Sequence, residues 1–281
     1  MKTAIITGAN GSMGEEITRN LAKQHFHVVM ACKRAQESIV LCEKIRKETN
    51  NPNVEFIHLD LSSFDSIKQF VADFSSKYQQ IAVLGNNAGV LCHHPEETAE
   101  KVEKTIGVNY LGHYLLTELL FPYMQNGTRI VNMVSLTYKY GNIDSDFFSL
   151  KKYPFNRFKF YADSKLALVH ATLEWAEKWK EKGITVNCSD PGIVNTNIIG
   201  LGNVWLDFAC DIFYRPFIRK PAKGADTFIY LATHDAVKNS TGTLFKNRKP
   251  QKLHPKATDI SARQALLEQT MRFLAEKQKE K

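Results

Sequence analysis

Short apolar runs alternate along the chain with segments in which apolar residues recur at helical spacing. In the third of these segments, Ile67, Phe70 and Phe74 fall on one side of a helix. Continuous apolar strands between amphipathic helices are typical of a parallel sheet with helices on both faces. The pattern predicts one doubly wound α/β domain over residues 1–281, with ligands bound at the carboxyl ends of its strands. The apolar runs fall at residues 3–7, 28–32, 54–59, 82–84, 129–134 and 185–189.

Length and composition describe an ordinary soluble globular chain. The 281 residues are 43% hydrophobic and 23% charged, and no apolar run approaches the roughly 18 to 20 residues that span a bilayer. Since the first strand directly follows the initiator methionine, we expect no targeting segment. Five scattered cysteines without a CxxC pair favour reduced thiols and a cytoplasmic location. Nine histidines form no HxxxH pair in a suitable setting, so we predict no metal site.

Positive charge is concentrated near the C-terminus. The net charge is +8, from 37 Lys and Arg against 29 Asp and Glu, and residues 237–281 hold 11 of the former and 4 of the latter. A uniformly basic nucleic-acid binder would spread this charge, so we predict no nucleic-acid partner. Two interpretations of the basic segment 247–281 stay open: a solvated segment without a specific partner, or one attracted to an anionic surface such as lipid or RNA.

A glycine-rich turn follows the first strand. Its sequence, Thr7-Gly-Ala-Asn-Gly-Ser-Met-Gly14, stands between a buried strand and a helix, where backbone amides and the helix N-terminus bind a pyrophosphate. We therefore expect a Rossmann-type dinucleotide site, with a plain tight turn as the alternative. The residues of this turn predicted to bind the cofactor are Gly8, Asn10, Ser12, Met13 and Gly14.

The second strand is followed by two cations, Lys33 and Arg34. An acidic residue at this point would bond the ribose hydroxyls and favour NAD, whereas cations would meet the 2′-phosphate of NADP. The nearest acid, Glu37, falls on the next predicted helix. The residues therefore favour NADP(H) over NAD(H), with two solvated loop charges as the alternative.

Three motifs, in this order, resemble those of the short-chain dehydrogenase/reductase family: the glycine turn, Asn86-Asn-Ala-Gly89 after the fourth strand, and Tyr161-Ala-Asp-Ser-Lys165 on a later helix. The match runs from residue 5 to about residue 196. Further segments are similar to the retinol-dehydrogenase-like branch of this family and extend the resemblance nearly to the C-terminus. They are Ala31-Cys-Lys33, Gly107-Val-Asn-Tyr-Leu-Gly-His113, Arg129-Ile-Val-Asn132 and Thr241-Gly-Thr-Leu-Phe-Lys246.

The resemblance implies further cofactor contacts. Asp60, with Leu61 beside it, would face the adenine, and a loop that follows the sixth strand would close over the nicotinamide carboxamide. One departure from the family pattern is Ser12, which replaces the middle glycine and whose Cβ crowds the approach of the backbone to phosphate. The ribose segment and the nicotinamide loop would contribute Asn87, Ala88, Gly89, Pro191, Gly192 and Thr196.

Tyr161 and Lys165 are four residues apart on a predicted helix, so they share one face. An ammonium beside a phenol lowers the tyrosine pKa from about 10 toward working pH, which suits acid/base chemistry on alcohols and ketones. Ser135, at the carboxyl end of a strand, would bind the substrate oxygen. The resemblance implies that Asn109 holds a water linking Lys165 to solvent, and that Tyr161 and Lys165 also contact the cofactor.

Each member of this catalytic set has a structural alternative. Ser135 would cap the segment that follows it, and Asn109 would link its side chain to the backbone. Tyr161 and Lys165 would be a tyrosine at the edge of the core beside a surface lysine.

Two segments indicate an apolar substrate. Residues 138–160, rich in aromatic side chains, form an insertion that resembles one in the retinol-dehydrogenase-like branch, and we expect it to line the substrate pocket. Residues 198–220 predict a helix with one charged stripe and an otherwise apolar surface, ended or kinked by Pro216. By resemblance this helical stretch is the substrate lid. Core or dimer packing and peripheral contact with a membrane surface are the alternatives.

Together these features predict an NADP-dependent oxidoreductase that transfers a hydride between the nicotinamide and a lipophilic alcohol or carbonyl compound. Retinoids, steroids and fatty aldehydes all fit such a site. The alternative is a protein without enzymatic activity that senses NADPH or docks a partner on the same fold. The resemblance also implies a homo-oligomer.

Overall fold

The computed structural model describes residues 1–148, 154–192 and 220–280. Eight strands form one sheet, in which every neighbouring pair is parallel except the last. The doubly wound parallel sheet predicted from the sequence is therefore confirmed. The strands, in spatial order, are β3 (Val54–His58), β2 (His27–Cys32), β1 (Thr3–Thr7), β4 (Ile81–Asn86), β5 (Met124–Met133), β6 (Thr185–Asp190), β7 (Leu244–Lys246) and β8 (Lys249–Gln251).

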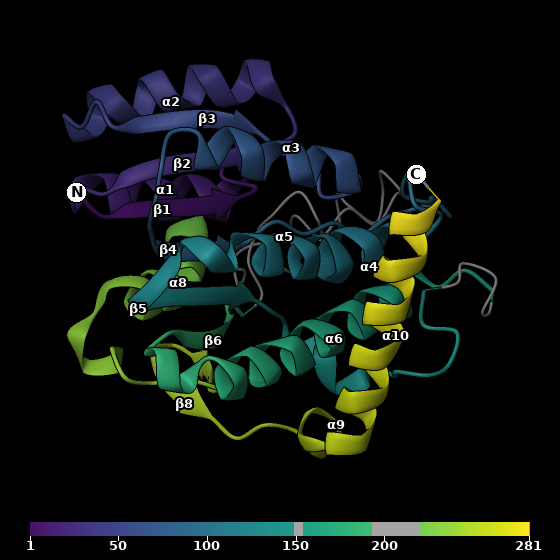
Figure 1. The fold of residues 1–281 in the computed structure, drawn as a ribbon. Helices are drawn as coiled ribbons and strands as arrows, with labels where there is room; N and C mark the ends of the chain where they lie inside the picture. Colours follow the sequence, from purple (N-terminus) through teal and green to yellow (C-terminus); the bar gives the residue numbers. More distant parts are fainter. Residues whose placement is uncertain (149–153, 193–219, 281) are drawn as a thin grey trace, which may run out of the picture.

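Helices cover both faces of the sheet (Figure 1). Successive residues of β1 point to opposite faces, so that Ala4 and Ile6 pack in one buried cluster and Ile5 in the other. Burial on both sides explains why the strands appear in the sequence as continuous apolar runs. The first cluster contains residues of α1 (Ser12–Lys23), α2 (Ala35–Thr49) and α8 (Pro221–Thr233), and the second contains residues of α3 (Phe64–Ser75), α5 (His113–Leu120) and α6 (Arg157–Lys178).

Short elements account for most of what the apolar pattern did not predict. The strands β7 and β8 have three residues each, too few for an alternation or an apolar run to be visible. Within the described ranges before β7, the short helical elements are α4 (Lys104–Ile106), η1 (Gly107–Gly112), η2 (Phe121–Tyr123), η3 (Leu136–Tyr140), η5 (Lys180–Lys182) and η7 (Asp235–Val237).

The basic C-terminal segment is folded, which corrects the interpretation of residues 247–281 as a solvated tail. After β8 the chain forms α9 (Pro255–Thr258) and α10 (Ile260–Lys279), and α10 lies across α6 (Figure 1). Leu266 and Leu267 of α10 are buried in the core. Arg263 lies on the same side of α10 as these leucines, is 8% exposed and pairs with Glu177 of α6 at 3.1 Å, so one of the basic side chains docks together with the apolar residues.

The described part of the insertion between Ser135 and Tyr161 packs against η1 and the C-terminal helix, and its place in the wall of the substrate pocket stays a prediction. In its described part, Phe147 is fully buried and lies edge-on to Tyr110, with ring centroids 5.9 Å apart. Phe148 stacks on the same Tyr110 and packs at a tilt of 32° against Phe273 of α10. These aromatic side chains therefore fill the core between the insertion and the C-terminal helix.

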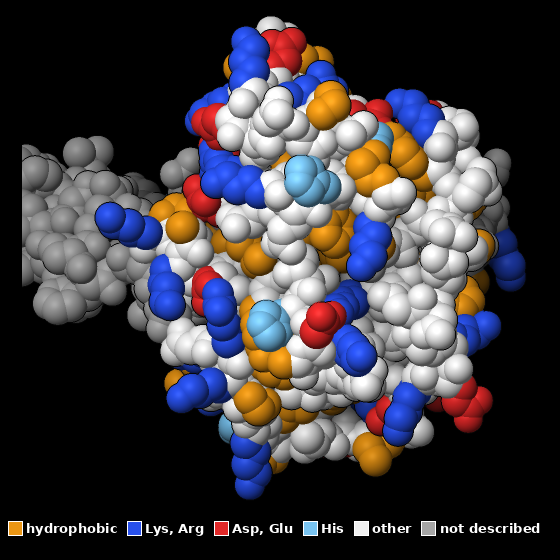
Figure 2. All heavy atoms as spheres, turned by 90° about the vertical axis from the view of Figure 1, so that its left-hand side faces the viewer, with side chains coloured by type: hydrophobic (Ala, Val, Ile, Leu, Met, Phe, Trp, Pro, Cys, Tyr) orange, Lys and Arg blue, Asp and Glu red, His pale blue; other side chains and the backbone are white. Residues whose placement is uncertain are grey.

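Several predictions concern segments or properties at the surface. The predicted lid at 198–220 lies outside the described residues except for Lys220. Among the residues that the structure describes, no helix combines the length and apolarity needed to cross a membrane. Lys and Arg side chains are scattered singly over the face shown in Figure 2, between hydrophobic and other side chains. In the same described ranges the four cysteines Cys32, Cys42, Cys92 and Cys188 are buried and free.

Candidate active site

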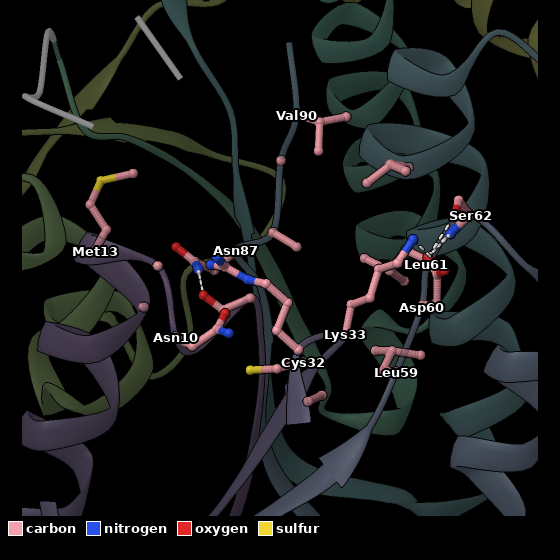
Figure 3. Close-up of a pocket in the computed structure, with 18 of the residues that line it drawn as sticks. Asn10, Met13, Cys32, Lys33, Leu59, Asp60, Leu61, Ser62, Asn87 and Val90 are labelled. Carbon is pink, nitrogen blue, oxygen red and sulfur yellow. Dashed lines mark hydrogen bonds and ion pairs between the residues drawn. The ribbon is translucent and has the colours of Figure 1, made fainter. Parts of the chain in front are cut away.

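A cavity of about 330 Å³ opens at the carboxyl ends of β1 to β4 (Figure 3). The structure brings to it every cofactor residue predicted from the first half of the sequence, although these residues come from four separate strand ends. Its lining includes Gly8, Asn10, Ser12, Met13, Gly14, Lys33, Arg34, Asp60, Leu61, Asn87, Ala88 and Gly89.

The glycine turn leaves the N-terminus of α1 open toward this cavity. Gly11 occupies the N-cap position, and no side chain caps the first backbone N–H groups of the helix. A Cβ on Gly14 would lie 2.2 Å from the Gly8 carbonyl oxygen, so only glycine allows this close approach of turn and helix. Ser12, in place of the family's middle glycine, is the exposed first residue of α1. The turn fits the pyrophosphate of a dinucleotide.

The segment after β4 is fastened to the end of β1. The hydroxyl oxygen of Thr7 accepts hydrogen bonds from the backbone N–H groups of Asn87 and Ala88, at 2.9 and 3.0 Å. The Asn87 side chain donates in turn to the Thr7 carbonyl oxygen at 3.0 Å. This segment is therefore held rigidly where the resemblance expects the ribose.

The adenine end of the cavity carries paired charges. Lys33 lies 2.8 Å from the Asp60 carboxylate, toward which it points in Figure 3, and Arg34 lies 2.9 Å from Glu37 in the first turn of α2. Burial disfavours the ionised Asp60, but hydrogen bonds from Lys33 and Ser62 outweigh it and lower the pKa of this carboxyl. Both cations thus have an acidic neighbour that would compete with a cofactor phosphate.

Sequence reasoning missed some residues of the cavity. Cys32, Leu59 and Val108 flank predicted residues, and this adjacency was a usable signal. Lys104 of α4, which is paired with Glu96 at 2.6 Å, carries no such signal, because only the folding of α4 beside the adenine end brings it there.

Tyr161, Lys165 and Ser135 meet beside the cavity. Tyr161 and Lys165 lie on consecutive turns of α6, with the Lys165 ammonium 5.4 Å from the centre of the phenol ring. Ser135 follows the carboxyl end of β5 and hydrogen-bonds the Tyr161 side chain. Its hydroxyl also accepts a bond from the Thr137 backbone N–H at 3.3 Å, so the capping role weighed as an alternative coexists with this contact.

Asn109 lies within the π-helical turn η1, a feature often found at functional sites. Its side chain accepts a bond from the Val90 backbone N–H at 2.8 Å and donates to the Val90 carbonyl oxygen at 3.0 Å. It also donates to the hydroxyl of Ser164, three residues after Tyr161 on α6, at 3.1 Å. Asn109 therefore joins the ribose segment to the catalytic helix through its side chain, leaving its backbone carbonyl for another partner.

The pKa of Tyr161 shifts opposite to the direction predicted from the spacing of Tyr161 and Lys165. Burial, followed by the negative charge of Asp190, raises this pKa to about 12, and the hydrogen bond from Ser135 only partly opposes the rise. Burial also lowers the pKa of Lys165 to about 8. The ammonium donates to the Met133 carbonyl oxygen at 2.9 Å and faces the phenol ring, so the tyrosine lacks a direct bond from it.

The nicotinamide end is only partly described. Pro191 and Gly192 follow β6, where the Gly192 N–H donates to the Asp190 carboxylate at 3.4 Å, and Thr196 lies outside the described residues. Neither Pro191 nor Gly192 lines the cavity described above. In the described ranges no three His, Cys, Asp or Glu side chains gather as metal ligands.

A parallel sheet with an open dinucleotide turn at its carboxyl edge, next to a buried lysine and a tyrosine on one helix, defines the class of nicotinamide-dependent Rossmann-type oxidoreductases. Within that class, residues 2–203 match the family model of the short chain dehydrogenases. The chain belongs to this family of NAD(P)-binding oxidoreductases of CH–OH groups, and the resemblance predicted from the motifs is confirmed.

Individual relatives are consistent with this family. The chain is 32% identical to retinol dehydrogenase 13 of Mus musculus over 97% of its own length and 84% of the relative's, and 35% identical to polyprenol dehydrogenase of Danio rerio over 89% and 80%. Among solved structures, an uncharacterised protein from Mycobacterium paratuberculosis has the same fold, with a TM-score of 0.78 at 23% identity over 97% and 93% of the two chains. A short-chain dehydrogenase from Shigella flexneri 2a complexed with NADP gives 0.68 at 19% identity over 88% and 97%.

Proposed function

We propose that this protein is an NADP-dependent oxidoreductase of lipophilic alcohols or carbonyl compounds. The observation that carries the proposal is the meeting of Tyr161, Lys165, Ser135 and Asn109 at the carboxyl edge of the sheet, next to the dinucleotide cavity. The bound nicotinamide supplies or takes up the hydride. The residues of the chain supply the proton and the geometry.

In the direction of carbonyl reduction, Tyr161 donates its phenolic proton to the substrate oxygen. A phenol whose pKa is about 12 stays protonated at neutral pH, as a general acid must. Ser135 donates a hydrogen bond to the same oxygen as negative charge develops on it. Lys165, buried below the phenol ring, stabilises the phenolate that remains. As the family resemblance implies, Asn109 would hold a water that links Lys165 to solvent, through which the proton is replaced.

Lys33 and Arg34 support the preference for NADP over NAD, because both are cations that line the adenine end of the cavity. The 2′-phosphate of NADP, with more negative charge than one carboxylate, would draw them away from Asp60 and Glu37. The bound NADP in the Shigella flexneri relative is consistent with this choice.

The names of the relatives support a lipophilic substrate, since retinol and polyprenols are long apolar alcohols. The substrate classes to test are retinoids, steroids and fatty aldehydes. We further infer one catalytic domain over residues 1–281, a homo-oligomer and a cytoplasmic location. The four free buried cysteines of the described ranges are consistent with this location.

The experiment that tests the proposal is NADPH consumption by the purified protein with a panel of lipophilic aldehydes and ketones. Tyr161→Phe should lower kcat about a thousandfold, because it removes the proton donor. Tyr140→Phe, at a tyrosine that is 80% exposed, is the matched control and should turn over like the wild type. Turnover mainly with NADH would contradict the role of Lys33 and Arg34.

A second candidate function is an NADPH sensor or docking protein without turnover. NADPH binding that Tyr161→Phe leaves unchanged, with no turnover on any member of the panel, would favour it. Fluorescence titration with NADPH separates this outcome from loss of cofactor binding.

A further inference from the structure

The side chain of His113 bridges the two halves of the site. It is fully buried at the start of α5. Its Nδ1 lies 3.2 Å from the backbone carbonyl oxygen of Asn109, and its Nε2 lies 3.0 Å from the hydroxyl of Thr7. Thr7 ends β1 at the glycine turn, and Asn109 lies in the π-helical turn η1. One imidazole therefore joins the cofactor loop to the catalytic turn.

The hydrogen-bond partners define the protonation state of this imidazole. A carbonyl oxygen only accepts, so Nδ1 carries a proton and donates it to Asn109. The Thr7 oxygen already accepts two backbone N–H bonds, from Asn87 and Ala88, which use both of its lone pairs. Nε2 is therefore an acceptor, and the Thr7 hydroxyl proton is shared between Nε2 at 3.0 Å and the Gly85 carbonyl oxygen at 3.2 Å. The ring is neutral, in agreement with burial and the nearby charge of Lys165, which lower the pKa of His113 to about 3.

These bonds form a closed ring around the ribose segment. Thr7 holds Asn87 and Ala88, the chain continues to Val90, Asn109 holds Val90, and His113 joins Asn109 back to Thr7. Because this set of hydrogen bonds closes on itself, none of the bonded segments can move independently of the others. A displacement of the ribose segment must be shared by the turn that carries Asn109, which in turn is bonded to α6 through Ser164.

We propose that His113 is a positioning residue that couples the cofactor-binding segment to the catalytic turn, acting as a neutral bridge with its proton on Nδ1. His113 is not among the residues that line the cavity, and its hydrogen bonds go to Asn109 and Thr7, through which it acts. The kinetic part of the inference rests on the proposed function. The structural part, which is the bridge and its tautomer, does not.

Two substitutions separate the halves of the bridge. The amide of an asparagine reaches the place of Nδ1, so His113→Asn keeps the donor to Asn109 and loses the acceptor for Thr7. The amide of a glutamine reaches the place of Nε2, so His113→Gln keeps the Thr7 acceptor and loses the donor. Thr7 retains a second acceptor, the Gly85 carbonyl oxygen at 3.2 Å, whereas the Asn109 carbonyl loses its bridge. His113→Gln should therefore lower kcat about tenfold, and His113→Asn about threefold, each with a smaller change in KM.

A matched control exists in His170 on α6, which is fully buried, and neither of its ring nitrogens has a hydrogen-bond partner within the described part of the chain. His170→Asn and His170→Gln should change the melting temperature. Neither should lower kcat selectively relative to KM. If His113→Asn and His113→Gln lose kcat equally, or if their losses merely follow melting temperature as in the His170 pair, the positioning role is wrong.

The bridge itself is tested by NMR of protein carrying ¹⁵N-labelled histidine, with His113→Gln used to assign the signal. The nitrogen shifts should show a neutral ring with the proton on Nδ1 that persists to pH 5. A proton on Nε2, or titration near the ordinary histidine pKa of about 6.5, would overturn the bridge. Because this measurement needs no substrate, it stays decisive if the turnover assay fails.

Discussion

The two ends of the cofactor site are built from different kinds of interaction. At the catalytic end, Lys165 and Asn109 are 2% and 0% exposed and are bonded to the backbone or to other buried groups. At the adenine end, the side chains of Lys33 and Arg34 are 60% and 63% exposed and rely on ion pairs at the surface. Charges act strongly where water is excluded and weakly where it screens them. A single charged group should therefore matter much more at the first end than at the second.

The largest effect is expected from Lys165→Met, which keeps the buried volume and removes the charge below the phenol. We expect kcat to fall about a thousandfold, because among the described residues Lys165 is the cation that faces the Tyr161 ring and can stabilise its phenolate. Lys178→Met, at a half-exposed lysine of the same helix that pairs with Glu118, is the control and should keep its turnover. A loss below tenfold in the Lys165 variant would remove the contrast between the two ends.

The same lysine gives a pH signature in stability. Its pKa is about 8 in the folded protein against 10.5 ordinarily, so between these values the unfolded chain binds more protons than the folded one. The free energy of unfolding of the wild type, relative to Lys165→Met, should be constant below pH 8 and rise by about 3 kcal/mol up to pH 10.5. Urea titrations of both proteins across this window measure the difference, and a flat difference would mean that Lys165 is not desolvated.

A smaller effect is expected at the adenine end. Replacing Lys33 and Arg34 together by alanine should reduce the proposed preference for NADPH over NADH about tenfold at low salt, since each exposed ion pair is worth only about 1 kcal/mol. The effect should shrink as ionic strength rises. Lys47→Ala on α2 serves as the control for loss of positive charge. A reduction that is independent of salt would show that these cations are more enclosed with cofactor than without it.

The smallest effect is expected from Asp60→Asn, which frees Lys33 while an amide oxygen still accepts from Ser62. NADPH should bind about twofold tighter, because a weak surface ion pair no longer competes with the phosphate. Fluorescence titration resolves this change. Weaker binding would instead mean that the carboxylate itself contacts the cofactor, as the family resemblance implies.

How much the sequence could predict varied between these regions for a physical reason. The glycine turn and the spacing of Tyr161 and Lys165 were visible because both follow from local backbone geometry. The docking of α10 was missed because its charges dominate the composition, while its few buried leucines matter only against α6. The contribution of Lys104 to the cavity was missed because it depends on the placement of a three-residue helix.

The sequence by itself determined the alternation of strands and helices, the open turn after β1 and the residue types of the catalytic set, since these depend on each residue and its near neighbours. Only the tertiary structure decided the direction in which the pKa values of Tyr161 and Lys165 move, because burial by distant segments outweighs the contact between the two. The bridge from Thr7 through His113 to Asn109 was likewise decided by the fold, which brings together an imidazole and a hydroxyl 106 positions apart in the chain.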